Sequence, residues 1–204
     1  MDKGRLEAFS DGVIAILITI MVLELRPPAE VSLAALAALA PVLFSYALSF
    51  VSIGIYWLNH HHLLAGSHVV TGGVLGWNLH LLFWLSMVPF GTAWIGENAF
   101  APLAVAVYGF ILLACGVSYF FLWRVLMRAQ PPGAPLLVSE GDQRKGMLSV
   151  IGYTSGMVLA LVVPMVSMGI YVLIAATWFI PDRRIEQATR AARTANDHGH
   201  HHTE

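Results

Sequence analysis

The sequence predicts an all-α, polytopic membrane protein with six transmembrane helices per chain. Only 11% of its 204 residues are charged and 57% are hydrophobic, whereas soluble domains carry about 25% charged residues. The apolar residues occur in runs of roughly 20, the length that an α-helix needs to cross the hydrocarbon core of a bilayer. We therefore expect most of the surface to face lipid. We find no Gly-rich phosphate loop and no long loop where a soluble substrate could bind.

The first two spans are bounded by polar or helix-breaking residues. The first is predicted over residues 8–25 and stops at the Arg-Pro-Pro sequence 26–28. It lacks a small-residue cleavage site, so we expect a retained helix rather than a signal peptide. The second is predicted over residues 33–58 and ends at the polar run 59–62, which contains three histidines.

The next two spans are also separated by a short polar turn. The third is predicted over residues 74–95 and contains Pro89, and the turn 96–98 follows it. The fourth is predicted over residues 101–126, with Arg124 and Arg128 at its end.

The long uncharged run 146–181 is too long for one ordinary span and short for two. Pro164 and Gly169 lie near its middle, so we place a reversal at residues 165–167 and expect two helices. One long tilted helix, giving five spans in all, is the alternative.

The distribution of Lys and Arg favours six spans over five. With six spans and a cytoplasmic N-terminus, 10 of the 11 Lys and Arg residues lie inside, and Arg26 alone lies outside. This is the bias of the positive-inside rule. Residues 1–181 are then the transmembrane domain, and residues 182–204 are a cytoplasmic tail that is basic and contains histidines. The basic stretch 183–193 reads as a stop-transfer flank or a contact with lipid headgroups.

The first span begins with an acid, and an intramembrane carboxylate is a functional-site hypothesis by default. Ser10 and Asp11 could instead cap the helix, and Arg5 could pair with Asp11. At 100° per residue, Asp11 points away from a stripe that contains Ile16, Thr19, Ile20 and Leu23. This stripe is compatible with lipid contact or core packing as well as with a functional surface.

Other polar residues lie in the second and third spans. The adjacent histidines His60, His61 and His62 lack the i, i+4 spacing of paired metal ligands, so we predict no metal site. We expect them to be hydrogen-bond partners of Asp11. Asn78 and His80 are expected to bridge helices.

Several motifs in these spans resemble the transmembrane-protein-175 family, the lysosomal potassium channels and their bacterial homologues. The first is Arg5-x-x-x-Phe9-Ser10-Asp11-Gly12-Val13, followed by Ala15-Ile16-x-x-Thr19. Further similar motifs are Ser49-Phe50-x-x-Ile53-Gly54-x-Tyr56-Trp57-x-x-His60-His61, then Asn78, then Pro89-Phe90-x-Thr92. The resemblance covers about residues 5–181. This chain departs from the family pattern at Leu64, where a Phe is expected, and Glu24 is unusual.

The resemblance implies a homotetramer in which the first helix of each chain lines a central pore. The pore positions are then Ile16 at the narrow point, Thr19 as a hydroxyl ring that contributes to potassium preference, and Leu23 as the next layer. A polar network would hold the pore helix to its neighbours. Its predicted members are Arg5, Phe9, Ser10, Asp11, His60, His61 and Asn78.

From this resemblance we predict a modestly potassium-selective cation channel with a hydrophobic gate, in the plasma membrane of a bacterium. We predict no enzyme activity, no cofactor and no nucleic-acid partner, with membrane lipids and permeant potassium ions as the other partners. The main alternative is a proton-coupled transporter or proton pathway that uses Asp11 and the buried histidines. A metal-dependent membrane enzyme built on residues 60–62 and a membrane scaffold without transport activity are further alternatives.

Overall fold

The computed structural model describes residues 2–67, 69–130 and 140–179, and all the secondary structure in these residues is helical. This confirms the predicted all-α class. The predicted tail 182–204 and its basic stretch 183–193 lie outside the described residues. The helices are α1 Lys3–Leu23, α2 Leu33–Ala38, α3 Ala40–Ala65, α4 Gly72–Ser86, α5 Val88–Glu97, α6 Pro102–Ala129, α7 Glu140–Leu159 and α8 Pro164–Phe179.

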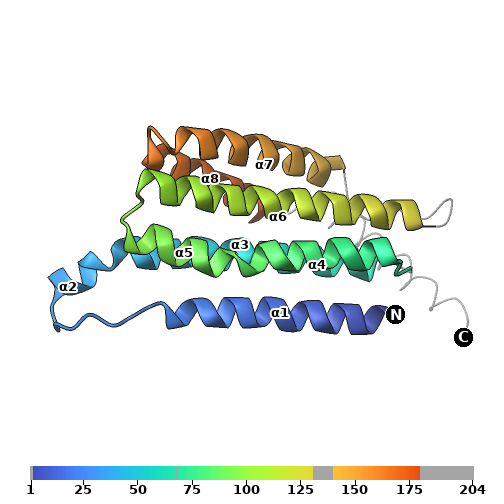
Figure 1. Ribbon diagram of the computed structural model, residues 1–204, viewed down its shortest axis with the longest axis horizontal. Coiled ribbons are helices and arrows are strands. Elements are labelled where there is room, and N and C mark those ends of the chain that lie inside the picture. Colours follow the sequence, from blue (N-terminus) through green and yellow to red (C-terminus); the bar gives the residue numbers. More distant parts are fainter. Residues whose placement is uncertain (1, 68, 131–139, 180–204) are drawn as a thin grey trace, which may run out of the picture.

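The long helices lie side by side along the long axis of the molecule (Figure 1). α1 forms one edge of this bundle and packs against α3, α4 and α5. α6 packs against α4 and α5 on one side and against α7 on the other, and α7 pairs with α8. Because α1 lies at an edge, one of its faces has no partner among the helices that the structure describes.

Among the described residues, four helical segments are long and apolar enough to cross a membrane: α1, α3, Gly72–Glu97 and α6. α8 is a shorter apolar helix. The chain is therefore a multi-pass membrane protein, and the spanning of the bilayer by α7 and α8 stays a prediction. The segment Gly72–Glu97 contains both α4 and α5, which are separated at Met87. Pro89 has no N–H to donate to the carbonyl of Leu85, and this interrupts the helix.

The described part of the uncharged run, residues 146–179, lies in two helices, α7 and α8, so the alternative of one long tilted helix is wrong. The reversal occupies residues 160–163 rather than the predicted 165–167. Pro164 explains the difference because it begins α8, and proline is favoured in the first helical turn, where its missing N–H has no intrahelical acceptor.

Several helix ends also differ from the prediction. Asp2 caps α1 by accepting a hydrogen bond from the backbone N–H of Gly4, so Ser10 and Asp11 lie well inside the helix and the capping interpretation is wrong. α3 continues to Ala65, so the histidines 60–62 are helical and do not end it. At its start, a separate short helix, α2, precedes the break at Leu39.

Candidate functional site

The two faces of α1 differ in what covers them. The face toward α3, α4 and α5 is buried and carries Leu6, Ser10, Ile14, Leu17 and Met21. The opposite face is uncovered in the single chain, and the predicted pore residues lie there. Ile16 is 56% exposed, Leu23 is 74% exposed, and Thr19 between them is also exposed.

The Thr19 hydroxyl is oriented by its own helix. Its Oγ1 donates a hydrogen bond of 2.9 Å to the carbonyl of Ile16. A hydroxyl has one hydrogen and two acceptor lone pairs, so this bond leaves the oxygen free to accept or to coordinate. The exposed face of α1 therefore presents bulky apolar side chains together with one oxygen ligand.

On the buried face, Ser10, Asn78 and His60 form a continuous hydrogen-bonded chain. Ser10 Oγ donates to the carbonyl of Leu6 at 2.9 Å, and it accepts from Asn78 Nδ2 at 2.9 Å. Asn78 Oδ1 lies 2.7 Å from His60 Nε2. Because an amide oxygen only accepts, His60 must carry its hydrogen on Nε2. This series of hydrogen bonds joins α1, α4 and α3.

The hydrogen-bonded side chains of Ser10, Asn78 and His60 are shielded from both lipid and water. Ser10 and Asn78 are 0% exposed and His60 is 1% exposed. A buried polar group that loses its partner costs about 1–3 kcal/mol, and here the amide has both its oxygen and its nitrogen paired. The three side chains therefore fix the position of α1 against α3 and α4.

Asp11 has a different partner from the one we predicted. Its Oδ1 accepts a hydrogen bond of 3.0 Å from Trp57 Nε1, so the expectation that histidines bind this acid is wrong. His60 is bonded to Asn78, and the exposed ring of His61 stacks on Trp57 with 6.1 Å between ring centroids. Trp57 lies one helical turn before His61 on α3, and its indole N–H reaches Asp11 on α1.

Arg5 and Phe9 stand apart from this network. Both are exposed on the uncovered side of α1, with Phe9 half exposed. In the described part of the chain, no ion pair joins Arg5 to Asp11; the ion pair found on α1 is between Lys3 and Glu7. The single chain thus unites Ser10, Asn78 and His60, places Asp11 and His61 beside Trp57, and leaves Arg5 and Phe9 without a place in the network.

Two further observations bear on the sequence predictions. His80 Nδ1 lies 2.8 Å from Ser118 Oγ, so His80 bridges α4 and α6 as Asn78 bridges α4 to α1 and α3. No group of three or more His, Cys, Asp or Glu side chains that could hold a metal occurs among the residues described.

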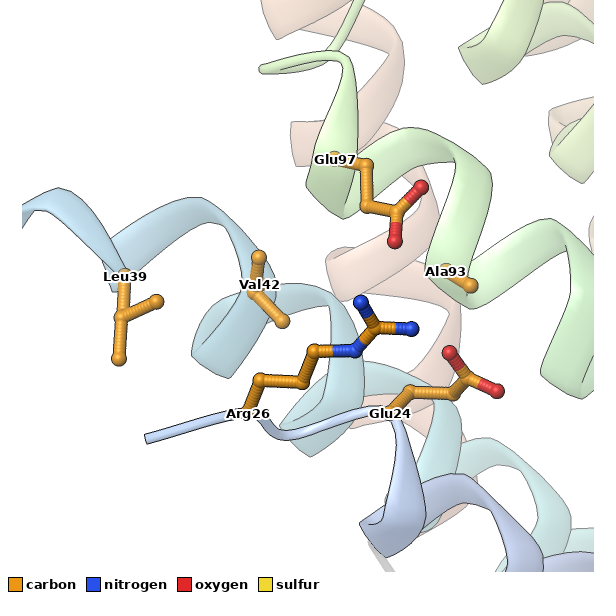
Figure 2. A pocket seen from close by; sticks show the side chains of 6 residues that line it. All are labelled: Glu24, Arg26, Leu39, Val42, Ala93 and Glu97. Carbon is orange, nitrogen blue, oxygen red and sulfur yellow. The ribbon is translucent and has the colours of Figure 1, made fainter. Parts of the chain in front are cut away.

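The C-terminal end of α1 borders a pocket of about 180 Å³, lined by Glu24, Arg26, Leu39, Val42, Ala93 and Glu97. Figure 2 shows the guanidinium of Arg26 between the carboxylates of Glu24 and Glu97. The acid near the end of the predicted pore stripe thus has a positive charge beside it.

Sequence reasoning missed two features: the Trp57 partner of Asp11 and a buried group of hydroxyls at Ser49, Thr92 and Tyr108. The second feature had a signal, because Ser45, Ser49 and Ser52 recur at helical spacing on one face of a predicted span.

The sequence matches known channels. Residues 5–89 match the family described as Endosomal/lysosomal potassium channel TMEM175. A potassium channel of Chryseobacterium sp. (strain P1-3) is 45% identical over 190 residues, which are 93% of this chain and 99% of the relative. A potassium channel of Chamaesiphon minutus is 37% identical over 132 residues, which are 60% of this chain and 65% of the relative.

A comparison with solved structures also finds a channel of this family. The chain is similar to the crystal structure of a lysosomal potassium-selective channel TMEM175 homolog from Chamaesiphon minutus, with a TM-score of 0.75 and 29% identity. The match covers 86% of this chain and 95% of that one. The alternative of a metal-dependent enzyme is therefore wrong. This chain belongs to the TMEM175 family, a family of channels and not of enzymes, as its first-helix motif predicted.

Proposed function

We propose that this chain is the subunit of a homotetrameric potassium channel in the plasma membrane of a bacterium, and that α1 of each subunit lines the pore. One observation carries the proposal: Ile16, Thr19 and Leu23 share the uncovered face of α1, while the opposite face is bonded to other helices. The two bacterial relatives are named potassium channels, which supports potassium as the permeant ion.

The gate is assigned to Ile16. Four copies of this branched side chain around an axis would form a hydrophobic constriction, and such constrictions block ions by dewetting. A small outward movement of the four helices would rewet it. The exposure of Ile16 in the single chain supports this role, because an apolar side chain near the middle of α1 then has no partner except lipid or other subunits.

Ion preference is assigned to Thr19. Its hydroxyl hydrogen is used by the carbonyl of Ile16, so its lone pairs are available to a partly dehydrated cation. One ring of hydroxyls offers far fewer oxygens than a stacked carbonyl filter, so we expect only modest selectivity for potassium over sodium.

Both termini are assigned to the cytoplasm. The N-terminus of α1, with Lys3 and Arg5, lies at the same end of the bundle as the C-terminus of α6, with Arg124 and Arg128 (Figure 1). Arg26 lies beyond the other end of α1. The positive-inside rule favours this orientation, and the exposed apolar side chains elsewhere on the bundle then contact membrane lipids.

Recording from purified protein in a planar bilayer with potassium on one side and sodium on the other tests the proposal. A channel gives stepwise currents, and their reversal potential gives the selectivity. We expect Ile16→Asn to raise the resting current several-fold because a polar ring holds water in the constriction. Val22→Asn is the matched control, since Val22 is 46% exposed on α1 but off the pore stripe. Absence of stepwise current in the wild type would refute the proposal.

A proton pathway is the second candidate, favoured by the buried chain of His60, Asn78 and Ser10. Its test is a pH gradient with the same potassium concentration on both sides. A current that reverses at the proton equilibrium potential and is lost in His60→Asn would support it. A current unaffected by the gradient would exclude it.

A further inference from the structure

A second group of buried hydroxyls lies toward the other end of α1. Ser49 of α3, Thr92 of α5 and Tyr108 of α6 are 0%, 6% and 0% exposed. Ser49 Oγ lies 2.8 Å from the Tyr108 hydroxyl and 2.6 Å from Thr92 Oγ1. Thr92 Oγ1 is also 2.7 Å from the carbonyl of Val88. We call these three side chains the hydroxyl cluster.

The cluster depends on close approach of α5 to its neighbours. A Cβ atom on Gly91 would stand 3.1 Å from Tyr108 Cδ2 and 3.0 Å from Ile111 Cδ1. A Cβ atom on Gly96 would stand 3.0 Å from the Cα of Val42 in α3. All three distances are shorter than ordinary van der Waals contact, so these glycines allow α5 to lie near enough for short hydroxyl side chains to meet.

Ser49 makes hydrogen bonds that differ from those of the neighbouring buried serines of α3. Ser45 and Ser52 lie on the same buried face of α3, and each donates to the carbonyl four residues earlier, at 2.7 and 2.8 Å. Ser49, between them, bonds to side chains of two other helices instead. Ser45 and Ser49 are thus alike in type and burial but differ in whether they join helices.

The hydroxyl cluster contacts α1 at Met21. Thr92 Oγ1 lies 3.9 Å from Met21 Sδ, and Met21 is 1% exposed. Met21 lies between Thr19 and Leu23 in the chain, and at 100° per residue it faces away from both. One turn of a helix moves as a unit. A shift of Met21 against Thr92 therefore also moves Thr19 and Leu23, which lie on the opposite face of α1.

We propose that Thr92, held in place by Ser49 and Tyr108, is a positioning residue that fixes where Thr19 and Leu23 stand in the pore. This inference rests on the proposed channel function. The contact between Thr92 and Met21 is the one polar contact that the described residues show from the half of α1 beyond Ile16 to another helix. Removal of the Thr92 hydroxyl would therefore change the ion preference at Thr19 and not only the stability of the fold.

The test compares Thr92→Val with the wild type in planar bilayers under a potassium–sodium gradient. Valine keeps the size and branching of threonine and removes the hydroxyl. We expect the potassium-to-sodium permeability ratio to change by about twofold or more, the change in an equilibrium that one buried hydrogen bond makes. Thr92→Ser, which keeps the hydroxyl, should restore the wild-type ratio.

Ser49→Ala should shift the ratio in the same direction, while Ser45→Ala should leave it unchanged, because the Ser45 hydroxyl donates to the carbonyl of Pro41 on its own helix. If Thr92→Val fails to assemble, Tyr108→Phe provides the measurement, since it removes one oxygen and keeps the ring. An unchanged ratio in the assembled variant, or an equal effect of Ser45→Ala, would overturn the inference. A wild type that does not conduct would instead refute the proposed function.

Discussion

The two halves of α1 are held to the bundle by different means. Near the cytoplasmic end in our proposed orientation, Ser10 is bonded directly to Asn78, which is bonded to His60. Beyond Ile16, the polar contact is a hydroxyl 3.9 Å from the sulfur of Met21. The first contact is a pair of short hydrogen bonds with distances of 2.9 and 2.7 Å, and the second is a weak interaction with a polarisable atom.

In the proposed channel, this difference gives α1 one half that is fixed and one half that can move. A satisfied buried network is costly to break, because each separated group stays away from water. The half of α1 near Ser10 is therefore expected to stay fixed. A methionine is flexible and makes adaptable contacts, so the half near Met21 can shift with less loss of free energy. The proposed gate at Ile16 lies between them.

The largest effect is expected from Asn78→Ala. It removes both hydrogen bonds of the amide and leaves His60 Nε2 without an acceptor in a buried site, while Ser10 keeps its bond to the carbonyl of Leu6. We expect a loss of about 1–3 kcal/mol of stability, the cost of one buried polar group without a partner. Thermal unfolding in detergent measures it. Asn98→Ala is the control, because Asn98 is exposed and bonds only to its own helix; an equal loss in the control would contradict the account of the network.

A smaller effect is expected from Trp57→Phe. The indole N–H donates to Asp11 at 3.0 Å, but Trp57 is 43% exposed, so water or lipid headgroups can replace part of the bond. We expect a loss of about 0.5–1.5 kcal/mol, the usual range for one hydrogen bond. Asp11→Asn removes the charge and keeps the acceptor oxygen, and it should cost less than Trp57→Phe. The reverse order in thermal unfolding would show that the charge, and not the bond, stabilises this site.

The smallest effect on stability is expected from Met21→Leu. The substitution nearly conserves volume, and such changes in a core usually cost less than about 1.5 kcal/mol. Unfolding should change little, while single-channel conductance should change, because the contact with Thr92 is lost next to Thr19. A loss of stability as large as that of Asn78→Ala would remove the distinction between the two halves of α1.

The fold class and most spans could be predicted from the sequence, because transmembrane helices are recognised by their length and apolar content. The reversal near Pro164 was predicted in kind but misplaced, since proline marks a helix start as readily as a turn. The break at Met87 was signalled by Pro89 in the third span. Helix starts were less predictable: Asp2, Ser10 and Asp11 are all good capping residues, and local sequence does not rank them.

The candidate site was predictable in its members more than in its pairings. The family motif pointed to Ser10, Asn78 and His60, and the helical stripe grouped Ile16, Thr19 and Leu23. Which polar group meets which depends on helix packing, so Trp57 rather than a histidine reached Asp11. The hydroxyl cluster joins three helices far apart in sequence and has no local pattern beyond the three serines of α3.

The central claim, that the uncovered face of α1 lines an ion pathway, is tested most directly by cysteine accessibility. The native Cys115 is buried at 0% exposure and can be replaced by alanine to give a background without cysteine. Single cysteines at Ile16, Thr19 and Leu23 are then treated with a charged, water-soluble thiol reagent during bilayer recording, with cysteines at Ile14 and Met21 as controls on the buried face. The account predicts that the reagent changes the current at the first three positions and not at the two controls; a current that responds at Ile14 and Met21 but not at Ile16, Thr19 and Leu23 would contradict it.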